Sequence, residues 1–148
     1  MPTEVTTLAE AQIRELIDGY AKAVRSRDLK GITANYAKDV VFFDAIPPLK
    51  YTGVEAYQKN WQECFDMMAG PIGYEITDLD VSANDELGFV RCLGRLSGTV
   101  KKDDQKMDMW FRATFGFRKT GGKWLVTHEH ASVPFYPDSE KAATDLKP

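Results

Sequence analysis

The sequence predicts an α+β domain in which a long, twisted antiparallel sheet curls around helices from the first half of the chain. Two observations support this. Up to Met68 the apolar side chains recur at the spacing of one helix face, whereas from Tyr74 to Pro134 they alternate with polar ones, as along a strand. The 148 residues suffice for one packed core but not for two domains. We therefore expect a single domain over residues 1–148, with its core at about 8–135 and short polar tails.

The first helix is predicted from Leu8 to about Ser26. Thr7 and Glu10 form a capping box at its start, in which each side chain bonds a free backbone N–H of the first turn. Its apolar stripe consists of Ile13, Leu16, Ile17, Tyr20 and Val24. This spacing places Tyr20 on the face that turns toward the core.

Two further helices follow. A short second helix begins at the cap Asp28 and carries on one face Leu29, Ile32 and Tyr36. Thr52 and Glu55 form a capping box for a third helix, whose apolar face consists of Tyr57, Trp61, Cys64, Phe65 and Met68. Gly70 and Pro71 end this helix.

Strands are predicted on both sides of the third helix. Val40–Phe43 is β-branched and aromatic, and Ile46–Leu49 leaves it as a loop because its two prolines cannot donate to a sheet. Four longer strands follow as an antiparallel meander, at Tyr74–Ala83, Leu87–Val100, Met107–Lys119 and Lys123–Pro134.

The last two long strands are joined at Lys119–Gly122. If these four residues form the hairpin loop, Arg118 pairs with Lys123 and Arg112 lies opposite Glu129. One face of the hairpin is then apolar and carries Phe111, Ala113, Phe115, Phe117, Trp124, Val126, His128 and His130. Pattern alone sends this face into the core and leaves Arg112 and Glu129 as an exposed ion pair.

Composition and charge narrow the function classes. The chain has 19 Lys and Arg against 22 Asp and Glu, a net charge of −3, so we expect neither a nucleic-acid nor a membrane partner. The longest apolar run, Val40–Phe43, is far below the ~20 residues of a membrane span, and the charged start of the chain is unlike a signal peptide. We expect a cytoplasmic protein in which Cys64 and Cys92 stay reduced, because neither has a CxxC partner.

No motif points to a bound cofactor. The chain lacks GxSxG, P-loop, GxGxxG and HExxH patterns, so acyl-enzyme chemistry, nucleotide binding and zinc proteolysis have no support. His128 and His130 point the same way at strand spacing, which suggests a metal, but the neighbours expected beside them, Ala113 and Phe111, offer no further ligand. We expect neither a metal nor another cofactor.

Three parts of the chain carry a resemblance to a known superfamily. They are the helix bearing Tyr20, the stretch NYAKDVVFFDAIPPLKYTGVEAY over Asn35–Tyr57, and the closing hairpin RKTGGKWLVTHEHASVPF over Arg118–Phe135. In these parts the sequence resembles the nuclear transport factor 2-like superfamily, specifically its SnoaL-like and ketosteroid-isomerase-like members. The resemblance implies a cone-shaped α+β barrel, with three N-terminal helices packed in the concave side of a strongly curved antiparallel sheet.

The resemblance also implies a catalytic set. Asp44 matches the general base of ketosteroid isomerases, because the spacings from Tyr36 to Asp44 and on to Gly53 agree without a gap. Tyr20 matches their oxyanion-hole tyrosine. Where those enzymes use a protonated aspartic acid as second donor, this chain has Thr114, a weaker acid, which argues against authentic steroid isomerisation.

A catalytic Thr114 would also decide which face of the sheet lines the cavity. The side bearing Arg112, Thr114 and Glu129 then turns inward, and the apolar side is convex. The superfamily resemblance implies that a homodimer buries this convex face, through Phe111, Phe115, Trp124, His128 and His130.

The preferred hypothesis is a cofactor-independent enzyme that transfers a proton on a small, largely apolar carbonyl compound, with an isomerase-like or cyclase-like outcome. Asp44 is the expected base, with Tyr20 and Thr114 as donors to the developing oxygen charge. Arg112 and Glu129 are expected to orient a polar substrate group, between apolar walls formed by Trp61, Phe65 and Trp110. Two alternatives stay open: a non-catalytic ligand-binding or oligomerisation module, and hydration with a water held by Arg112 and Glu129.

Overall fold

The computed structural model describes residues 7–148, with three helices and six strands. The helices are α1 (Leu8–Arg25), α2 (Leu29–Thr33) and α3 (Val54–Asp66). The strands are β1 (Tyr36–Phe43), β2 (Tyr51–Thr52), β3 (Met68–Ala83), β4 (Leu87–Val100), β5 (Lys106–Thr120) and β6 (Lys123–Ser132). They form one sheet in the order β2-β1-β6-β5-β4-β3, in which β1 and β6 run parallel and the other neighbours antiparallel.

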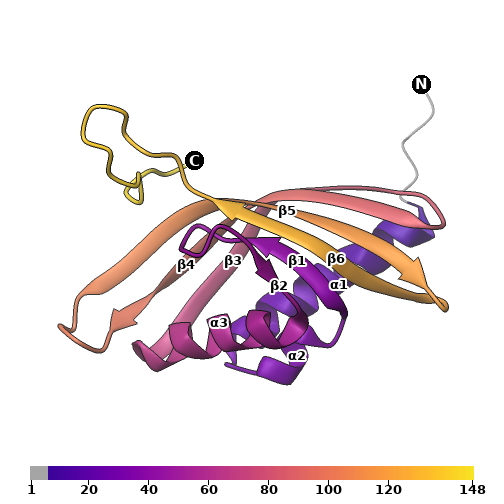
Figure 1. The fold of residues 1–148 in the computed structure, drawn as a ribbon, viewed down its shortest axis with the longest axis horizontal. Helices are drawn as coiled ribbons and strands as arrows, with labels where there is room; N and C mark the ends of the chain where they lie inside the picture. The colour runs from indigo at the N-terminus through magenta and orange to yellow at the C-terminus, as the bar shows by residue number, and fades with distance from the viewer. Residues whose placement is uncertain (1–6) are drawn as a thin grey trace.

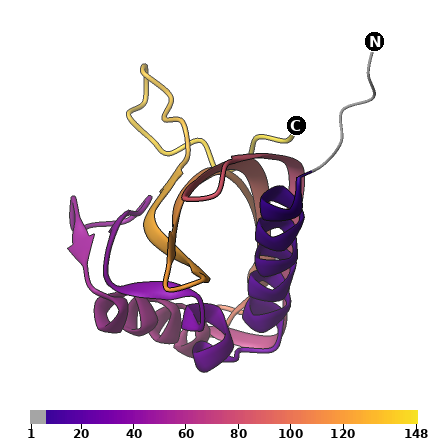
Figure 2. The same ribbon diagram turned by 90° about the vertical axis from the view of Figure 1, so that its right-hand side faces the viewer.

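The sheet is strongly curved, and the helices lie in its concave side (Figure 1). Figure 2 shows the strands bending over an interior that α1 closes on one side and α2 and α3 close below. Because β2 and β3 remain as edges, the sheet does not close into a full barrel. The predicted α+β fold, three helices against a curved and mostly antiparallel sheet, is confirmed. Within residues 7–148 no helix combines the length and apolar character needed to cross a membrane.

Two of the predicted helix caps are present. The Glu10 amide donates to the Thr7 hydroxyl at 3.1 Å, and the Gly31 amide donates to the Asp28 carboxylate at 3.0 Å. Each bond satisfies an N–H that the first helical turn leaves free. These short-range signals set the starts of α1 and α2.

The start of α3 differs from the prediction. Its N-cap is Gly53, which makes no side-chain bond, and Thr52 belongs to β2 instead, where it pairs with Val41. Gly53 has a φ of 99°, which a residue with a Cβ rarely adopts. Its amide donates to the Val40 carbonyl at 2.7 Å, so the chain turns directly from the sheet into the helix.

The end of α3 also comes earlier, at Asp66 rather than at Gly70. The Arg27 guanidinium donates to the carbonyls of Phe65, Met68 and Gly70, at 2.8, 3.1 and 2.7 Å. It thereby connects the last turn of α3, at Phe65, to the first residues of β3, at Met68 and Gly70. Arg27 fixes the path along which the chain passes from α3 into β3.

Tyr36 was predicted on the second helix but lies on β1, where it pairs with Val126 of the parallel strand β6. Its helical spacing after Ile32 is coincidental, because α2 ends at Thr33. Long-range pairing with β6 outweighs the local pattern here. Its place on β1 turns the Tyr36 side chain into the interior, where the residue is 8% exposed.

The predicted register of the last hairpin is wrong. The loop has two residues, Gly121 and Gly122, with φ of 58° and 78°, so Thr120 rather than Arg118 pairs with Lys123. Positive φ at both loop positions suits a tight turn that matches the strand twist. A bulge between Gly116 and Phe117 shifts the register again. Arg112 consequently lies opposite Ser132, and Glu129 lies opposite Phe115.

The faces of β5 are the reverse of those expected from a catalytic Thr114. The inner face of β5 is the apolar one, with Ala113, Phe115 and Phe117 buried against the helices. Thr114 and Arg112 alternate with these residues and therefore lie on the outer, convex face. The interpretation from pattern alone was right for β5, and the one taken from a catalytic Thr114 was wrong.

The residues expected at a dimer interface do not share one face. Phe115 and Trp124 are 1% and 4% exposed inside the chain's own core, and Phe111 packs against that core. His128 and His130 pair with Gly116 and Thr114 and so point outward. The interface predicted from these five residues is corrected, while the homodimer itself stays a prediction.

Candidate functional site

Four side chains from four elements converge in the interior. They are Tyr20 of α1, Tyr36 of β1, Tyr57 of α3 and Glu129 of β6, and we call them the tyrosine–glutamate cluster. The Tyr20 and Tyr57 hydroxyl oxygens lie 2.5 Å apart, and those of Tyr36 and Tyr57 lie 3.0 Å apart. Tyr57 is hydrogen-bonded to Glu129 Oε1 at 2.7 Å, and Tyr36 is hydrogen-bonded to the same oxygen.

The strand pairings explain why Glu129 faces inward. It lies opposite Phe115 on β5 and beside Phe42 on β1, which are both buried core residues. The bulge between Gly116 and Phe117 gives β6 this phase. Without the extra residue of the bulge, the alternation of side chains along β6 would turn Glu129 outward.

Burial dominates the electrostatics of Glu129. Its side chain belongs to the core, with 9% of the residue exposed, and desolvation raises its pKa from an ordinary 4.5 to about 7. The bonds to Tyr36 and Tyr57 pull the pKa down, because they favour the carboxylate, and the charge of Asp44 pushes it up. Glu129 therefore exchanges a proton near neutral pH.

The tyrosines of the cluster stay neutral. Burial raises the pKa of Tyr20, Tyr36 and Tyr57 well above the ordinary phenol range, and the charge of Glu129 raises each further. A neutral phenol has one proton to donate and lone pairs to accept. Proton movement within the cluster near neutral pH therefore starts at Glu129.

Aromatic side chains surround the cluster. The Tyr20 ring contacts Tyr36, Trp61, Tyr74 and Phe115, with ring centroids 5.9 to 6.4 Å apart. Trp61, one of the predicted walls, is half-buried and packs on Phe65 at 5.5 Å. Such a low-polarity shell strengthens every hydrogen bond and charge within it.

Asp44 lies just beyond the last residue of β1 and is half-buried. Its two carboxylate oxygens accept from the Asn60 amide at 2.6 Å and from the Ala45 backbone at 2.7 Å. Its charge contributes to the raised pKa of both Glu129 and Tyr74. Asp44 thus acts on the same interior as the cluster, and each of its oxygens keeps a lone pair for a proton.

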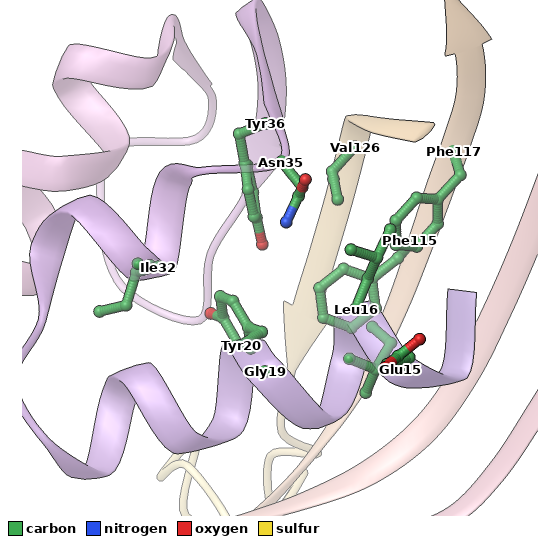
Figure 3. A pocket seen from close by; sticks show the side chains of 12 residues that line it. Glu15, Leu16, Gly19, Tyr20, Ile32, Asn35, Tyr36, Phe115, Phe117 and Val126 are labelled. Carbon is green, nitrogen blue, oxygen red and sulfur yellow. The ribbon is translucent and has the colours of Figure 1, made fainter. Parts of the chain in front are cut away.

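A cavity of about 150 Å³ opens between α1, α2 and the sheet, and Tyr20 and Tyr36 form part of its wall (Figure 3). Figure 3 shows the rings of Tyr36 and Phe115 on opposite sides of it, with the Asn35 amide turned inward. The remaining described lining residues are Glu15, Leu16, Ile17, Gly19, Gly31, Ile32, Phe117 and Val126. The cavity is mostly apolar and ends at two tyrosines of the cluster.

The structure brings together only some of the predicted site residues. Tyr20, Trp61, Phe65 and Glu129 pack in the interior and Asp44 is half-buried, and of these five the cavity is lined by Tyr20. Thr114 and Arg112 lie on the outer face, where Arg112 donates to Ser132 at 3.1 Å. Trp110 also lies outside, under the Arg95 guanidinium at 5.5 Å. The roles predicted for these three residues required an inward face and are not carried forward.

Tyr36 and Tyr57 were not predicted as site residues. Both had been placed on apolar stripes, so their burial was foreseeable, but spacing gives no sign that their hydroxyls meet. A buried tyrosine needs a partner for its hydroxyl, and several inward tyrosines together with one inward glutamate would have been the signal. Among residues 7–148 no group of His, Cys, Asp or Glu is arranged to hold a metal ion.

The family model described as SnoaL-like domain matches residues 13–136. The chain belongs to the SnoaL-like domain family. None of the curated proteins matches it.

Solved structures agree with this assignment. This SnoaL-like domain is similar to a nuclear transport factor 2-like protein of unknown function from Pseudomonas putida KT2440, with 43% identity, a TM-score of 0.87, and coverage of 98% of this chain and 100% of that one. A ketosteroid isomerase-like protein from Erwinia carotovora atroseptica SCRI1043 shares 22% identity over 82% of this chain and 93% of that one, with a TM-score of 0.70. A protein named as a candidate scytalone dehydratase, from Novosphingobium aromaticivorans DSM 12444, has 14% sequence identity to this chain and a TM-score of 0.76. The match covers 96% of this chain and 98% of that one. The last two likenesses concern the fold alone.

Proposed function

We propose that this SnoaL-like domain catalyses cofactor-independent proton transfer on a small, largely apolar carbonyl compound. The observation that carries the proposal is the buried tyrosine–glutamate cluster, in which neutral phenols and a carboxyl with a pKa of about 7 meet inside an aromatic shell. Neutral donors held in a dry interior stabilise an oxygen that gains negative charge during a reaction. The fold shared with proteins named for isomerase-like and dehydratase activity supports the same class of chemistry.

In this mechanism Asp44 is the base. It removes a proton from the carbon next to the carbonyl, and the C–H electron pair moves into the carbonyl to give an enolate. The Tyr20 hydroxyl donates to the enolate oxygen. The protonated Asp44 then returns the proton to the same carbon or to a conjugated one, so exchange or isomerisation results with no other reactant.

Proton abstraction can be tested without knowing the natural substrate. Incubation with cyclohexanone, cyclohexenone or acetophenone in deuterated water, followed by NMR, reports exchange of the hydrogens next to the carbonyl. We expect exchange above the buffer rate for at least one compound, and a fall of ~10²-fold or more in Asp44→Asn, the usual contribution of a general base. Asp39→Asn is the matched control, because Asp39 is an exposed carboxylate on β1. Exchange equal in wild type and Asp44→Asn would overturn the assignment of the base.

The size of the cavity favours a second candidate, a ligand-binding module without catalysis. Its volume of about 150 Å³ is below the ~300–1,000 Å³ usual for small-molecule sites. Binding of the same carbonyl compounds with exchange at the buffer rate would favour this alternative.

A further inference from the structure

The four hydroxyl and carboxyl groups of the cluster make four close contacts. Tyr20 meets Tyr57, Tyr57 meets Tyr36, and both Tyr36 and Tyr57 meet Glu129 Oε1. The Tyr20 hydroxyl is bonded to Tyr57 and also interacts with the neutral Tyr74 side chain, but it does not reach Glu129 directly, so it is an outer member of the chain that begins at Glu129. Tyr20 is also a wall of the cavity.

An ionised Glu129 leaves no proton for a ligand. The carboxylate only accepts, so Tyr36 and Tyr57 both donate to it. The 2.5 Å contact between Tyr20 and Tyr57 must then hold the Tyr20 proton, because two oxygens without a proton between them do not approach so closely. All three phenolic protons are committed inside the cluster.

A protonated Glu129 adds a fourth proton and reverses the chain. Its carboxylic O–H donates to Tyr57, Tyr57 in turn donates to Tyr20, and Tyr36 keeps its bond to the carboxyl. The contacts of Glu129 with Tyr36 and Tyr57 and the 2.5 Å contact between Tyr57 and Tyr20 still each contain a proton, whereas the longer Tyr36–Tyr57 contact of 3.0 Å contains none in either state. The Tyr20 O–H is then released from Tyr57 and can donate to an oxygen outside the cluster.

We propose that Glu129 is a positioning residue that acts in its protonated form, turning the hydroxyl chain so that Tyr20 donates to a carbonyl or enolate oxygen of the ligand. This deepens the proposed function and rests on it for the class of ligand. Glu129 touches no substrate in this arrangement and acts through Tyr57. When Glu129 ionises, Tyr20 should stop donating to the oxygen of the ligand.

The groups around Glu129 keep its protonated form accessible. It faces Tyr36 on β1, Tyr57 on α3, Tyr20 on α1, Tyr74 on β3 and Cys92 on β4, whose pKa values are all raised, so these groups stay neutral. Asp44 is the charged group that acts on it, and its negative charge favours protonation. The residues paired with Glu129 on the neighbouring strands, Phe42 on β1 and Phe115 on β5, carry no charge. The three ion pairs within residues 7–148 all lie at the surface, away from this carboxyl.

A titration of the tyrosines tests the relay without any ligand. In protein labelled with ¹³C at tyrosine Cζ, we expect the resonances of Tyr36, Tyr57 and Tyr20 to move together with a midpoint at about 7, the pKa of Glu129. Glu129→Gln should remove this step from all three. Tyr57→Phe should remove it from Tyr20 and leave it in Tyr36, since Tyr57 is the link. Glu75→Gln, an exposed glutamate on β3, is the matched control and should retain every step.

Two results would overturn the relay. One is a Tyr20 resonance that does not move while Glu129 titrates, and the other is a Tyr20 step that survives in Tyr57→Phe. A Glu129 that acts on Tyr20 only through its charge gives the second result, because that coupling does not pass through the Tyr57 hydroxyl.

Bound acetophenone provides the second arm, since its carbonyl does not ionise and its infrared stretch falls in frequency when it accepts a hydrogen bond. We expect the lowered frequency below the Glu129 midpoint and its loss above. In Glu129→Gln the frequency should no longer change with pH, because the amide does not titrate. A stretch independent of pH in wild type contradicts the proposal. A relay without proton exchange on the ligand would leave this inference standing and refute the proposed enzyme, so the two failures are distinguishable.

Discussion

Glu129→Gln should remove a specific pH dependence from the stability of the protein. Desolvation raises the Glu129 pKa from 4.5 to about 7 in the folded chain, so the folded protein holds this proton more tightly than the unfolded one does. The resulting stabilisation is complete below about pH 4.5 and is lost as the pH rises through about 7. Glutamine does not titrate and should show no such loss.

The size of the effect follows from the shift. At about 1.4 kcal/mol per pKa unit, the shift corresponds to about 3 kcal/mol of unfolding free energy. Most of this should disappear between about pH 5 and about pH 9. Because this is a sizeable part of the ~5–15 kcal/mol typical of a folded domain, it should be plain in a denaturation series.

Urea unfolding at several pH values measures this pH-dependent stabilisation. The quantity to compare is the wild-type unfolding free energy minus that of Glu129→Gln, because other titrating groups cancel in this difference. We expect the difference to fall by about 2–3 kcal/mol across the range. The corresponding difference for Glu75→Gln should stay flat, since Glu75 is exposed. A constant difference for Glu129→Gln would refute the argument that burial holds its proton.

Three further predictions concern packing and the cluster. Phe115→Ala should lower the unfolding free energy measured with urea by about 3–5 kcal/mol, because Phe115 faces the core. Thr114→Ala, at the neighbouring position on the outer face, should lower it by about 1 kcal/mol or less. Equal losses would contradict this assignment of the two faces of β5. Arg27→Ala should lower the unfolding free energy by about 2 kcal/mol in the same assay, because three hydrogen bonds to backbone carbonyls are lost. Arg27→Lys should recover only part of this, because a lysine ammonium lacks the planar fork of donors with which the guanidinium reaches all three carbonyls. Full recovery would show that the positive charge alone suffices. Tyr57→Phe should lower the unfolding free energy by about 1–2 kcal/mol, because its buried hydrogen bonds are lost. It should also raise the Glu129 pKa further, as measured by NMR, because the lost bond to Tyr57 favours the carboxylate. An unchanged pKa would contradict that hydrogen bond.

Local signals predicted the elements well. The Thr7 and Asp28 caps, the period change after α3, and the bounds of β4 at Leu87 and Val100 all match the structure. Each depends on residues close in sequence, where capping and alternation act directly.

The hairpin register was missed for a physical reason. Lys119–Gly122 allows a four-residue loop or a two-residue Gly-Gly turn, and the extra β6 residue Thr127, opposite Gly116 and Phe117, leaves no mark in the periodicity. These two features together move Glu129 from beside Arg112 to beside Phe115. The placement of Thr114 failed because it came from a positional match to relatives rather than from the apolar alternation of β5.

The convergence of Tyr20, Tyr36 and Tyr57 on Glu129 lay beyond sequence spacing. The contacts join residues 21 to 93 positions apart, and they depend on how α1 and α3 pack in the curve of the sheet. The sequence predicted Tyr20 and Glu129 as site residues, but with other partners. Only the assembled fold shows that one hydrogen-bonded chain links them.

The most direct test of the account is the titration of the Glu129 carboxyl itself. In protein labelled with ¹³C at glutamate Cδ, the resonance absent from Glu129→Gln identifies the residue, and its shift is followed with pH. We expect a midpoint at about 7, so that neutral Glu129 is present at neutral pH. A midpoint near the ordinary 4.5 would mean that the cluster holds a carboxylate, and the proton relay to Tyr20 would be contradicted.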